Sequence, residues 1–351
     1  MLFEMFDLEV TPIFASVVFG AVLGMLFGAA ALVSRFCLRR GLVNGADRSS
    51  ALGVWLTALM VAIIGTQAAQ WLGYVDFSDH RFAASDLPVL AILVGGLVFG
   101  AGMVLTRGCI SRLTVLSATG NLRALFVIAT FAIVAHATLK GVLATVRTSL
   151  GSVTVTTGDA ALLSGLPGGA VVWGGLSVAV IVAVVLRSGA RRRDLGLAAL
   201  IGALVPLGWI GTGFLLYDDF DPIALESMSF TAPWSDTLFW SIASTSIPAG
   251  FGTGMIGGVL VGSFAAAALR GELRLQSFSA PGETLRYLSG GALMGFGGVL
   301  AGGCTVGAGL SGVGTLSLAA ILALAAIMAG ARLTDRLVDR QSSEPVAVPA
   351  E

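Results

Sequence analysis

The chain has 351 residues, of which 56% are hydrophobic and 11% charged, and its mean hydropathy is +0.92. Soluble domains carry about 25% charged residues, so this composition excludes an ordinary soluble protein and predicts an all-α integral membrane protein in a lipid bilayer. The net charge is zero, and we expect no nucleic-acid partner. Three dispersed cysteines and two histidines are too few for a metal site, so we expect neither a metal nor a cofactor.

About nine apolar segments have the length that crosses a bilayer. The first six cover roughly 11–32, 50–71, 88–109, 122–146, 168–186 and 196–217. The stretch 237–269 is too long for one span, and Pro248 and Gly250 divide it into a short half-helix and a seventh span. The last two spans cover roughly 285–303 and 314–331.

The basic residues predict the orientation of these spans, because cytoplasmic loops of membrane proteins carry an excess of Lys and Arg. With an outside N-terminus and nine crossings, seventeen of the twenty basic residues fall on the inner side. Only Arg81, Lys140 and Arg147 fall on the outer side. We therefore predict an N-out, C-in topology.

A glycine-rich segment that ends in cysteine occurs twice. Residues 95–112, GGLVFGAGMVLTRGCISR, return as residues 290–307, GGALMGFGGVLAGGCTVG, with eight identities at a constant offset of 195. In the predicted topology the two copies run in opposite directions, as in transporters built from inverted repeats with broken helices. We predict two pseudo-symmetric inverted halves, 1–147 and 236–340, joined by a connector at 148–235 that carries the fifth and sixth spans. The tail 341–351 is predicted to be disordered.

The matched cysteines predict one site built from both halves. A free membrane cysteine is commonly a small packing residue, and helix packing explains the glycine series that begin at Gly20 and Gly254. Cys109 and Cys304, however, stand where a glycine-rich helix gives way to irregular chain. Such backbone is tolerated at membrane depth where it is buried in protein or lines a cavity. We predict a substrate pathway, without catalytic residues, that includes Arg107, Gly108, Cys109, Gly302, Gly303, Cys304 and Thr305.

The run that follows the second cysteine, TVGAGLSGVG at 305–314, has five glycines in ten residues. This is a poor sequence for a transmembrane helix. It is typical of a turn whose backbone N–H groups point at an anion near a following helix N-terminus.

At these motifs the chain resembles the YeeE/YedE family of bacterial inner-membrane sulfur transporters. The resemblance rests on RGC at 107–109, GGC at 302–304 and SRFC at 34–37, and it extends over nearly the whole chain. It implies an hourglass-shaped monomer with short helices dipping towards the centre, and it makes Cys37 the third functional cysteine. It also implies a location in the bacterial inner membrane and a TusA-like sulfur carrier protein as a cytoplasmic partner.

The function implied by the resemblance is import of thiosulfate, or a closely related small sulfur-containing anion, along a central cysteine-lined pathway rather than catalysis. Three alternatives stay open. One is transport of another sulfur or selenium compound. The second is a membrane thiol-disulfide oxidoreductase, which needs two cysteines within exchange distance. The third is a structural subunit in which the glycines serve helix packing alone.

Overall fold

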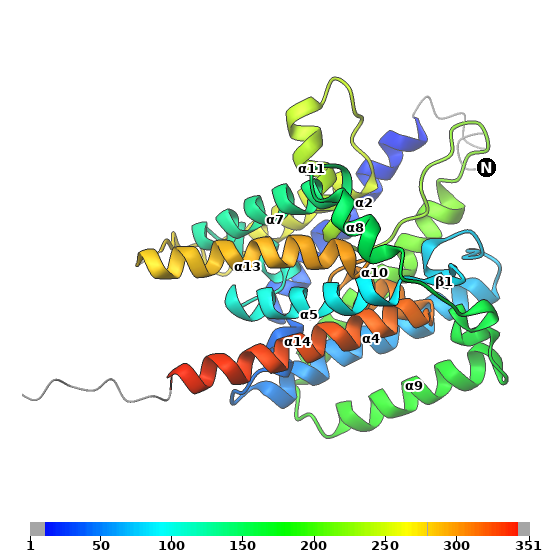
Figure 1. The fold of residues 1–351 in the computed structure, drawn as a ribbon, viewed down its shortest axis with the longest axis horizontal. Helices are drawn as coiled ribbons and strands as arrows, with labels where there is room; N and C mark the ends of the chain where they lie inside the picture. The colour runs from blue at the N-terminus through cyan, green and yellow to red at the C-terminus, as the bar shows by residue number, and fades with distance from the viewer. Residues whose placement is uncertain (1–10, 279, 343–351) are drawn as a thin grey trace, which may run out of the picture.

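The computed structural model describes residues 11–278 and 280–342, and this part of the chain is almost entirely helical (Figure 1). The longer helices are α2 (Pro12–Val33), α4 (Arg48–Trp71), α5 (Val89–Leu105), α7 (Leu122–Lys140), α9 (Gly169–Leu186), α10 (Arg192–Ile210), α11 (Thr231–Ala243), α12 (Phe251–Leu269), α13 (Pro281–Leu300) and α14 (Leu318–Ser342). The short helices and turns are α3 (Leu38–Leu42), α6 (Ile110–Ser117), α8 (Ala144–Gly151), η1 (Arg81–Ala83), η2 (Gly158–Ala161), η3 (Leu163–Gly165), η4 (Gly211–Leu215) and η5 (Gly307–Gly312). The two-residue strands β1 (Asp86–Leu87) and β2 (Val155–Thr156) pair antiparallel.

Eight segments of the described chain are helices long and apolar enough to cross a bilayer. They match the expected spans except the eighth. That segment forms α13, whose first turns carry Glu283 and Arg286 and are therefore less apolar than the rest. An all-α membrane fold is confirmed, while the count of nine crossings stays a prediction.

Several predicted boundaries need correction. The fourth span ends at Lys140, because the chain turns at Gly141 and Arg147 donates to the Thr138 carbonyl oxygen at 3.1 Å, capping α7 with a residue of α8. The half-helix before Pro248 is confirmed as α11, which begins already at Thr231. Helix α14 runs to Ser342, so the predicted disordered tail includes two helical residues, and 343–351 lie outside the described residues.

The glycine series on α2 and α12 pack against each other. A methyl group at Gly20, Gly24 or Gly28 would overlap backbone carbonyl oxygens of α12, and one at Gly254, Gly258 or Gly262 would overlap those of α2. Small residues spaced four apart allow two helix backbones to approach this closely. The packing role predicted for both series is confirmed.

Helices α5 and α13 cross through glycines that occupy matched positions in the two copies. A methyl group at Gly95 would lie 2.8 Å from the Gly297 carbonyl oxygen, and one at Gly102 would lie 2.5 Å from the Gly290 carbonyl oxygen. The later residue on α5 contacts the earlier residue on α13, so the two helices are antiparallel. The two glycine-cysteine copies are therefore in direct backbone contact.

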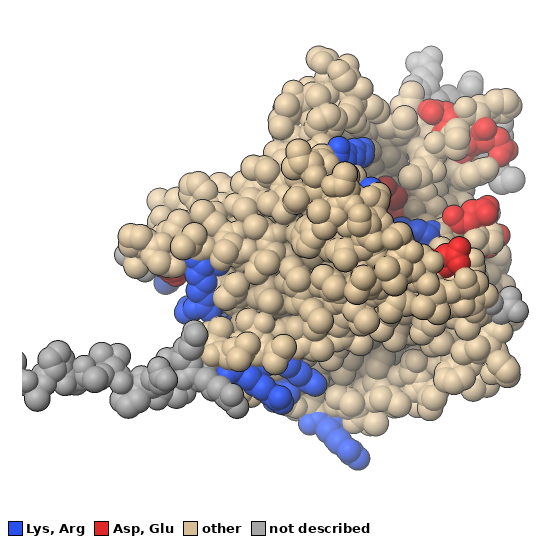
Figure 2. Space-filling view, in the orientation of Figure 1, with Lys and Arg blue, Asp and Glu red and all other residues tan. Residues whose placement is uncertain are grey.

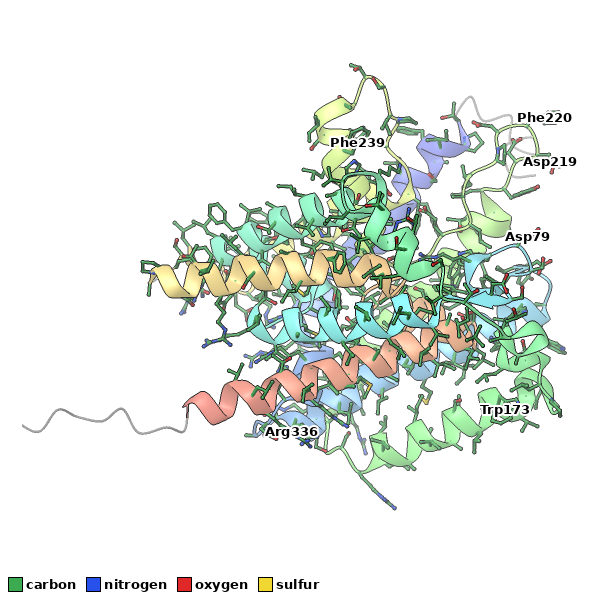
Figure 3. All side chains as sticks on the ribbon, viewed as in Figure 1. Asp79, Trp173, Asp219, Phe220, Phe239 and Arg336 are labelled. Carbon is green, nitrogen blue, oxygen red and sulfur yellow. The ribbon has the colours of Figure 1, made fainter. Side chains whose placement is uncertain are left out.

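Charge divides the molecule into two ends (Figure 2). The acidic end consists of the loops 72–88 and 216–230 with the neighbouring segment 141–168, and it carries Asp79 and Asp219 on its surface (Figure 3). The basic end consists of the loops that follow α2, α5, α9 and α12, together with the C-terminal part of α14, where Arg336 lies (Figure 3). This segregation is the one that the basic residues of the sequence predicted.

Candidate functional site

All three cysteines follow the end of a long helix in the same way. Arg35, Arg107 and Gly302 each stand two residues before a cysteine and have left-handed backbone, with φ of 52°, 57° and 74°. A left-handed residue ends an α-helix by turning the chain out of it. The cysteines therefore lie just past the ends of α2, α5 and α13.

The first two turns share their hydrogen bonds as well. The Phe36 N–H donates to the Ala31 carbonyl oxygen at 3.0 Å, and the Gly108 N–H donates to that of Met103 at 3.1 Å. These are the six-residue closures of a Schellman turn. One residue before each arginine, the Ser34 and Thr106 hydroxyls donate to carbonyl oxygens four residues earlier at 2.7 and 2.9 Å.

These turns bring the cysteine side chains together in the protein interior. Cys37, Cys109 and Cys304 are unpaired and at most 4% exposed. The Cys37 and Cys109 thiols lie within hydrogen-bonding reach of each other. Cys109 also shares a hydrogen bond of 3.1 Å with the Ser111 hydroxyl, and the Thr305 hydroxyl, next to Cys304, faces its sulfur.

Backbone N–H groups and one free hydroxyl complete the surroundings of the thiols. The Gly307 N–H donates to the Cys304 sulfur at 3.4 Å. The Thr305 hydroxyl is 1% exposed, and apart from the Cys109 sulfur that it faces it has no hydrogen-bond partner among the described residues. A buried hydroxyl without a partner costs about 1–3 kcal/mol, so this position suits a polar ligand that passes Cys109 and Cys304.

The run after Cys304 is more regular than predicted. Gly307–Gly312 forms the π-helix η5 and is completely buried, so a helix replaces most of the turn expected over 305–314. Glycine at Gly309 lets Trp55 pack on this wide turn, since an added methyl group would lie 3.2 Å from its ring. The expectation of an N–H directed at the site holds in one respect, because Gly307 points its N–H at a sulfur.

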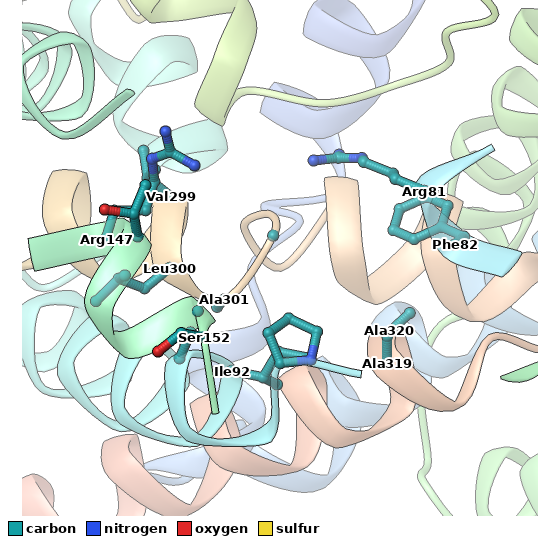
Figure 4. A pocket seen from close by; sticks show the side chains of 15 residues that line it. Arg81, Phe82, Ile92, Arg147, Ser152, Val299, Leu300, Ala301, Ala319 and Ala320 are labelled. Atoms are coloured by element: carbon teal, nitrogen blue, oxygen red, sulfur yellow. The ribbon is translucent and has the colours of Figure 1, made fainter. Parts of the chain in front are cut away.

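A cavity of about 480 Å³ opens at the acidic end and reaches the turn before Cys304 (Figure 4). Gly302 and Ala301 line its floor, and Arg81 and Arg147 line its walls. The Arg81 side chain points across the open space towards Arg147 (Figure 4). Two guanidinium groups above a cysteine-bearing turn make this mouth attractive to an anion.

A second cavity of about 190 Å³ also borders Arg81 and reaches Gly307, whose N–H donates to the Cys304 sulfur. Gly307 and Ser311 of η5 line it, together with Trp209 and Glu226. The Trp209 indole N–H is buried and has no partner among the described residues. Burial raises the pKa of the Glu226 carboxyl to about 7, and the negative charge of Asp236 adds to the rise.

The structure places the predicted site residues unequally. Gly108, Gly302, Gly303 and Thr305 belong to the turns around the thiols. The Arg107 side chain is exposed, so its contribution lies in its backbone conformation. Arg81, Arg147 and Trp209 were missed as site residues. The two arginines had a sequence signal, because both belong to the three basic residues on the predicted outer side.

Comparisons with known proteins identify the family of this chain. The profile of a family described as sulphur transport matches residues 33–333. The chain is 25% identical over 330 residues to a thiosulfate transporter, TsuA, of Escherichia coli, covering 85% of this chain and 87% of the relative. It is 27% identical over 317 residues to the protein of the same name from Spirochaeta thermophila, covering 85% and 92%. The chain is a multi-pass membrane protein and belongs to the YeeE/YedE family of sulphur transporters.

Proposed function

We propose that the protein imports thiosulfate, or a closely related small sulfur-containing anion, into the cytoplasm. The path runs from the cavities of the acidic end past Cys304, Cys109 and Cys37 to the basic end. The observation that supports it most is the convergence of three buried thiols at the ends of three helices. Thiols are weak hydrogen-bonding groups, so they can pass the terminal sulfur of thiosulfate along without holding it.

The charges along this path suit a dianion. Arg81 and Arg147 attract it into the mouth, and the backbone N–H groups of the broken helices replace part of its hydration inside. Near Cys37 the Arg112 guanidinium, which donates to the Ala31 carbonyl oxygen at 3.5 Å, provides a positive group towards the basic end. No covalent step is needed.

The proposed topology of nine crossings in the bacterial inner membrane, with an outside N-terminus, puts the acidic end outside and the basic end in the cytoplasm, so the proposed path from the acidic to the basic end is an import path. Two inverted halves are consistent with the packing. The Gly95–Gly297 contact becomes the Gly290–Gly102 contact when 195 is added to one number and subtracted from the other. The pairing of α2 with α12, one helix from each half, fits the same exchange of halves. A TusA-like sulfur carrier at the basic end stays a prediction.

The test is uptake of radiolabelled thiosulfate by cells that lack their own uptake systems. Wild type should accumulate label, and Cys37→Ala, Cys109→Ala and Cys304→Ala should each lose most of it at equal membrane expression. Thr57→Ala is the matched control, because its buried hydroxyl bonds only within α4. Wild type without uptake, in cells that an authentic thiosulfate transporter rescues, contradicts the substrate. Full uptake by all three variants contradicts the pathway.

One contact favours a second function, a membrane thiol-disulfide oxidoreductase. Cys37 and Cys109 are close enough to form the pair that thiol exchange needs. This function predicts thiol oxidation that persists in Cys304→Ala and disappears in Cys37→Ala. The transport function instead predicts that Cys304→Ala and Cys37→Ala both lose thiosulfate uptake.

A further inference from the structure

Glu226 lies where three cavities of the acidic end meet. It lines the cavity of about 190 Å³ that contains Arg81 and Trp209. It also lines one of about 190 Å³ with Lys140 and Asp236, and one of about 220 Å³ beside Pro248. A carboxylate is the least suitable side chain for the mouth of an anion pathway, so its presence there needs an explanation.

The backbone holds Glu226 firmly in this wall. Its N–H donates to the Thr212 hydroxyl oxygen at 3.0 Å, and that hydroxyl donates to its carbonyl oxygen at 2.7 Å. The next residue, Ser227, donates to the Val205 carbonyl oxygen at 2.7 Å. The carboxyl group forms no salt bridge within the described residues. Glu226 is thus an acid without a salt bridge, held in the wall that these three cavities share.

Charged and titratable groups face Glu226 from several elements. They are Arg81 of η1, His80 just before it, Asp236 of α11 and Lys140 of α7, with His136 of α7 behind Asp236. Lys140 and His136 act on Asp236, which they stabilise in its ionised form. Of the cations, Arg81 acts directly on Glu226, because its charge favours the ionised carboxylate.

We propose that Glu226 controls the admission of the anion past Arg81 by binding a proton; this inference rests on the proposed function. Ionised Glu226 offsets the charge of Arg81 and repels the dianion. Protonated Glu226 leaves Arg81 free to attract it, and the unpartnered Trp209 N–H supplies a neutral donor in the same cavity.

The relevant pH range lies around neutrality. Burial raises the pKa of Glu226 to about 7. Its charge therefore changes within the range over which the pH outside a bacterium varies. His80 does not add a competing change there, because burial and the neighbouring Arg81 lower its pKa to about 4. Thiosulfate itself stays a dianion over this range.

The test uses purified protein in proteoliposomes with equal pH on both sides, which removes any proton gradient. The KM for labelled thiosulfate exchange is measured from pH 5.5 to 8.5. For wild type the KM should rise on the order of tenfold as the pH increases through about 7, with little change in kcat. Glu226→Gln should keep the low KM at every pH.

Three further variants make the test specific. Asp236→Asn removes a negative charge that opposes ionisation of Glu226, so the KM transition should move to lower pH. His136→Gln should keep the wild-type transition, because His136 lines none of the three cavities that Glu226 borders. Asp219→Asn, on the exposed surface of the same loop, should change nothing. A pH-independent wild-type KM, or a transition that survives in Glu226→Gln, overturns the inference. Absence of all exchange by wild type would instead contradict the proposed function.

Discussion

Arg35 and Arg107 have the same left-handed backbone conformation, with φ of 52° and 57°, and each stands two residues before a buried cysteine. Both side chains are exposed at the basic end. In the third turn Gly302 occupies this position. The shared requirement is therefore a backbone shape that places a thiol beyond the end of a helix.

This relationship predicts how substitutions at Arg107 behave. A left-handed conformation costs an L-residue about 1 kcal/mol or more, whereas glycine has no such cost. Arg107→Gly should therefore be more stable than Arg107→Ala by about 1 kcal/mol, and both should transport thiosulfate, because the side chain lies outside the site. Thermal unfolding in detergent and uptake assays measure the two effects. Equal stability of the two variants would contradict the backbone role.

Gly302 and Gly303 should respond differently to alanine. A methyl group at Gly302 would have nothing within 4 Å, so Gly302→Ala should cost only the left-handed strain, about 1 kcal/mol. A methyl group at Gly303 would lie 2.6 Å from the Ala308 backbone nitrogen. Gly303→Ala should displace η5 from Cys304 and abolish uptake.

Gly108→Ala is the control for this pair. Its methyl group would meet the flexible Leu113 side chain at 3.4 Å, an ordinary contact. Uptake should be highest for Gly108→Ala, lower for Gly302→Ala and lowest for Gly303→Ala. Normal uptake by Gly303→Ala at wild-type stability would show that the close contact between this turn and η5 is dispensable.

Oxidation should link Cys37 to Cys109. Their thiols lie within hydrogen-bonding reach of each other, and the same is not found for Cys304 within the described residues. Mild copper-catalysed oxidation should give an intramolecular disulfide in wild type and in Cys304→Ala, detected by intact mass and peptide mapping. Cys37→Ala and Cys109→Ala should remain reduced. A predominant Cys109–Cys304 disulfide would contradict the arrangement described above.

The sequence predicted the parts of this protein that repeat. The two glycine-cysteine segments share an offset, so the matched ends of α5 and α13 and their antiparallel course could be inferred from residues alone. The Cys37 turn was predicted only through the family resemblance. Its local pattern, Ser-Arg-Phe-Cys, differs from Thr-Arg-Gly-Cys at the first and third residues, and a left-handed arginine is too rare to expect.

Other features depended on long-range packing. The π-helix η5 forms because Trp55, Phe82 and Ala320 close around its glycines, and these contacts come from distant parts of the chain. The cavity that Arg81 and Glu226 both line is formed by two loops more than a hundred residues apart in sequence. Neither loop contains a motif, so composition could indicate only that their charges lie outside the spans.

Glu226 should also make the stability of the folded protein depend on pH. Its folded-state pKa of about 7 lies above the ordinary value of 4.5, so the folded protein binds this proton more tightly than the unfolded chain. The resulting stabilisation is fully present below pH 4.5 and is lost as the pH rises through about 7. As the pH rises from 5 to 8, the unfolding temperature should therefore fall more for wild type than for Glu226→Gln. The comparison of the two proteins at each pH cancels His80, whose depressed pKa acts in the opposite direction. Parallel curves for the two proteins would show that this carboxyl has an ordinary pKa and cannot set the charge of the mouth near neutrality.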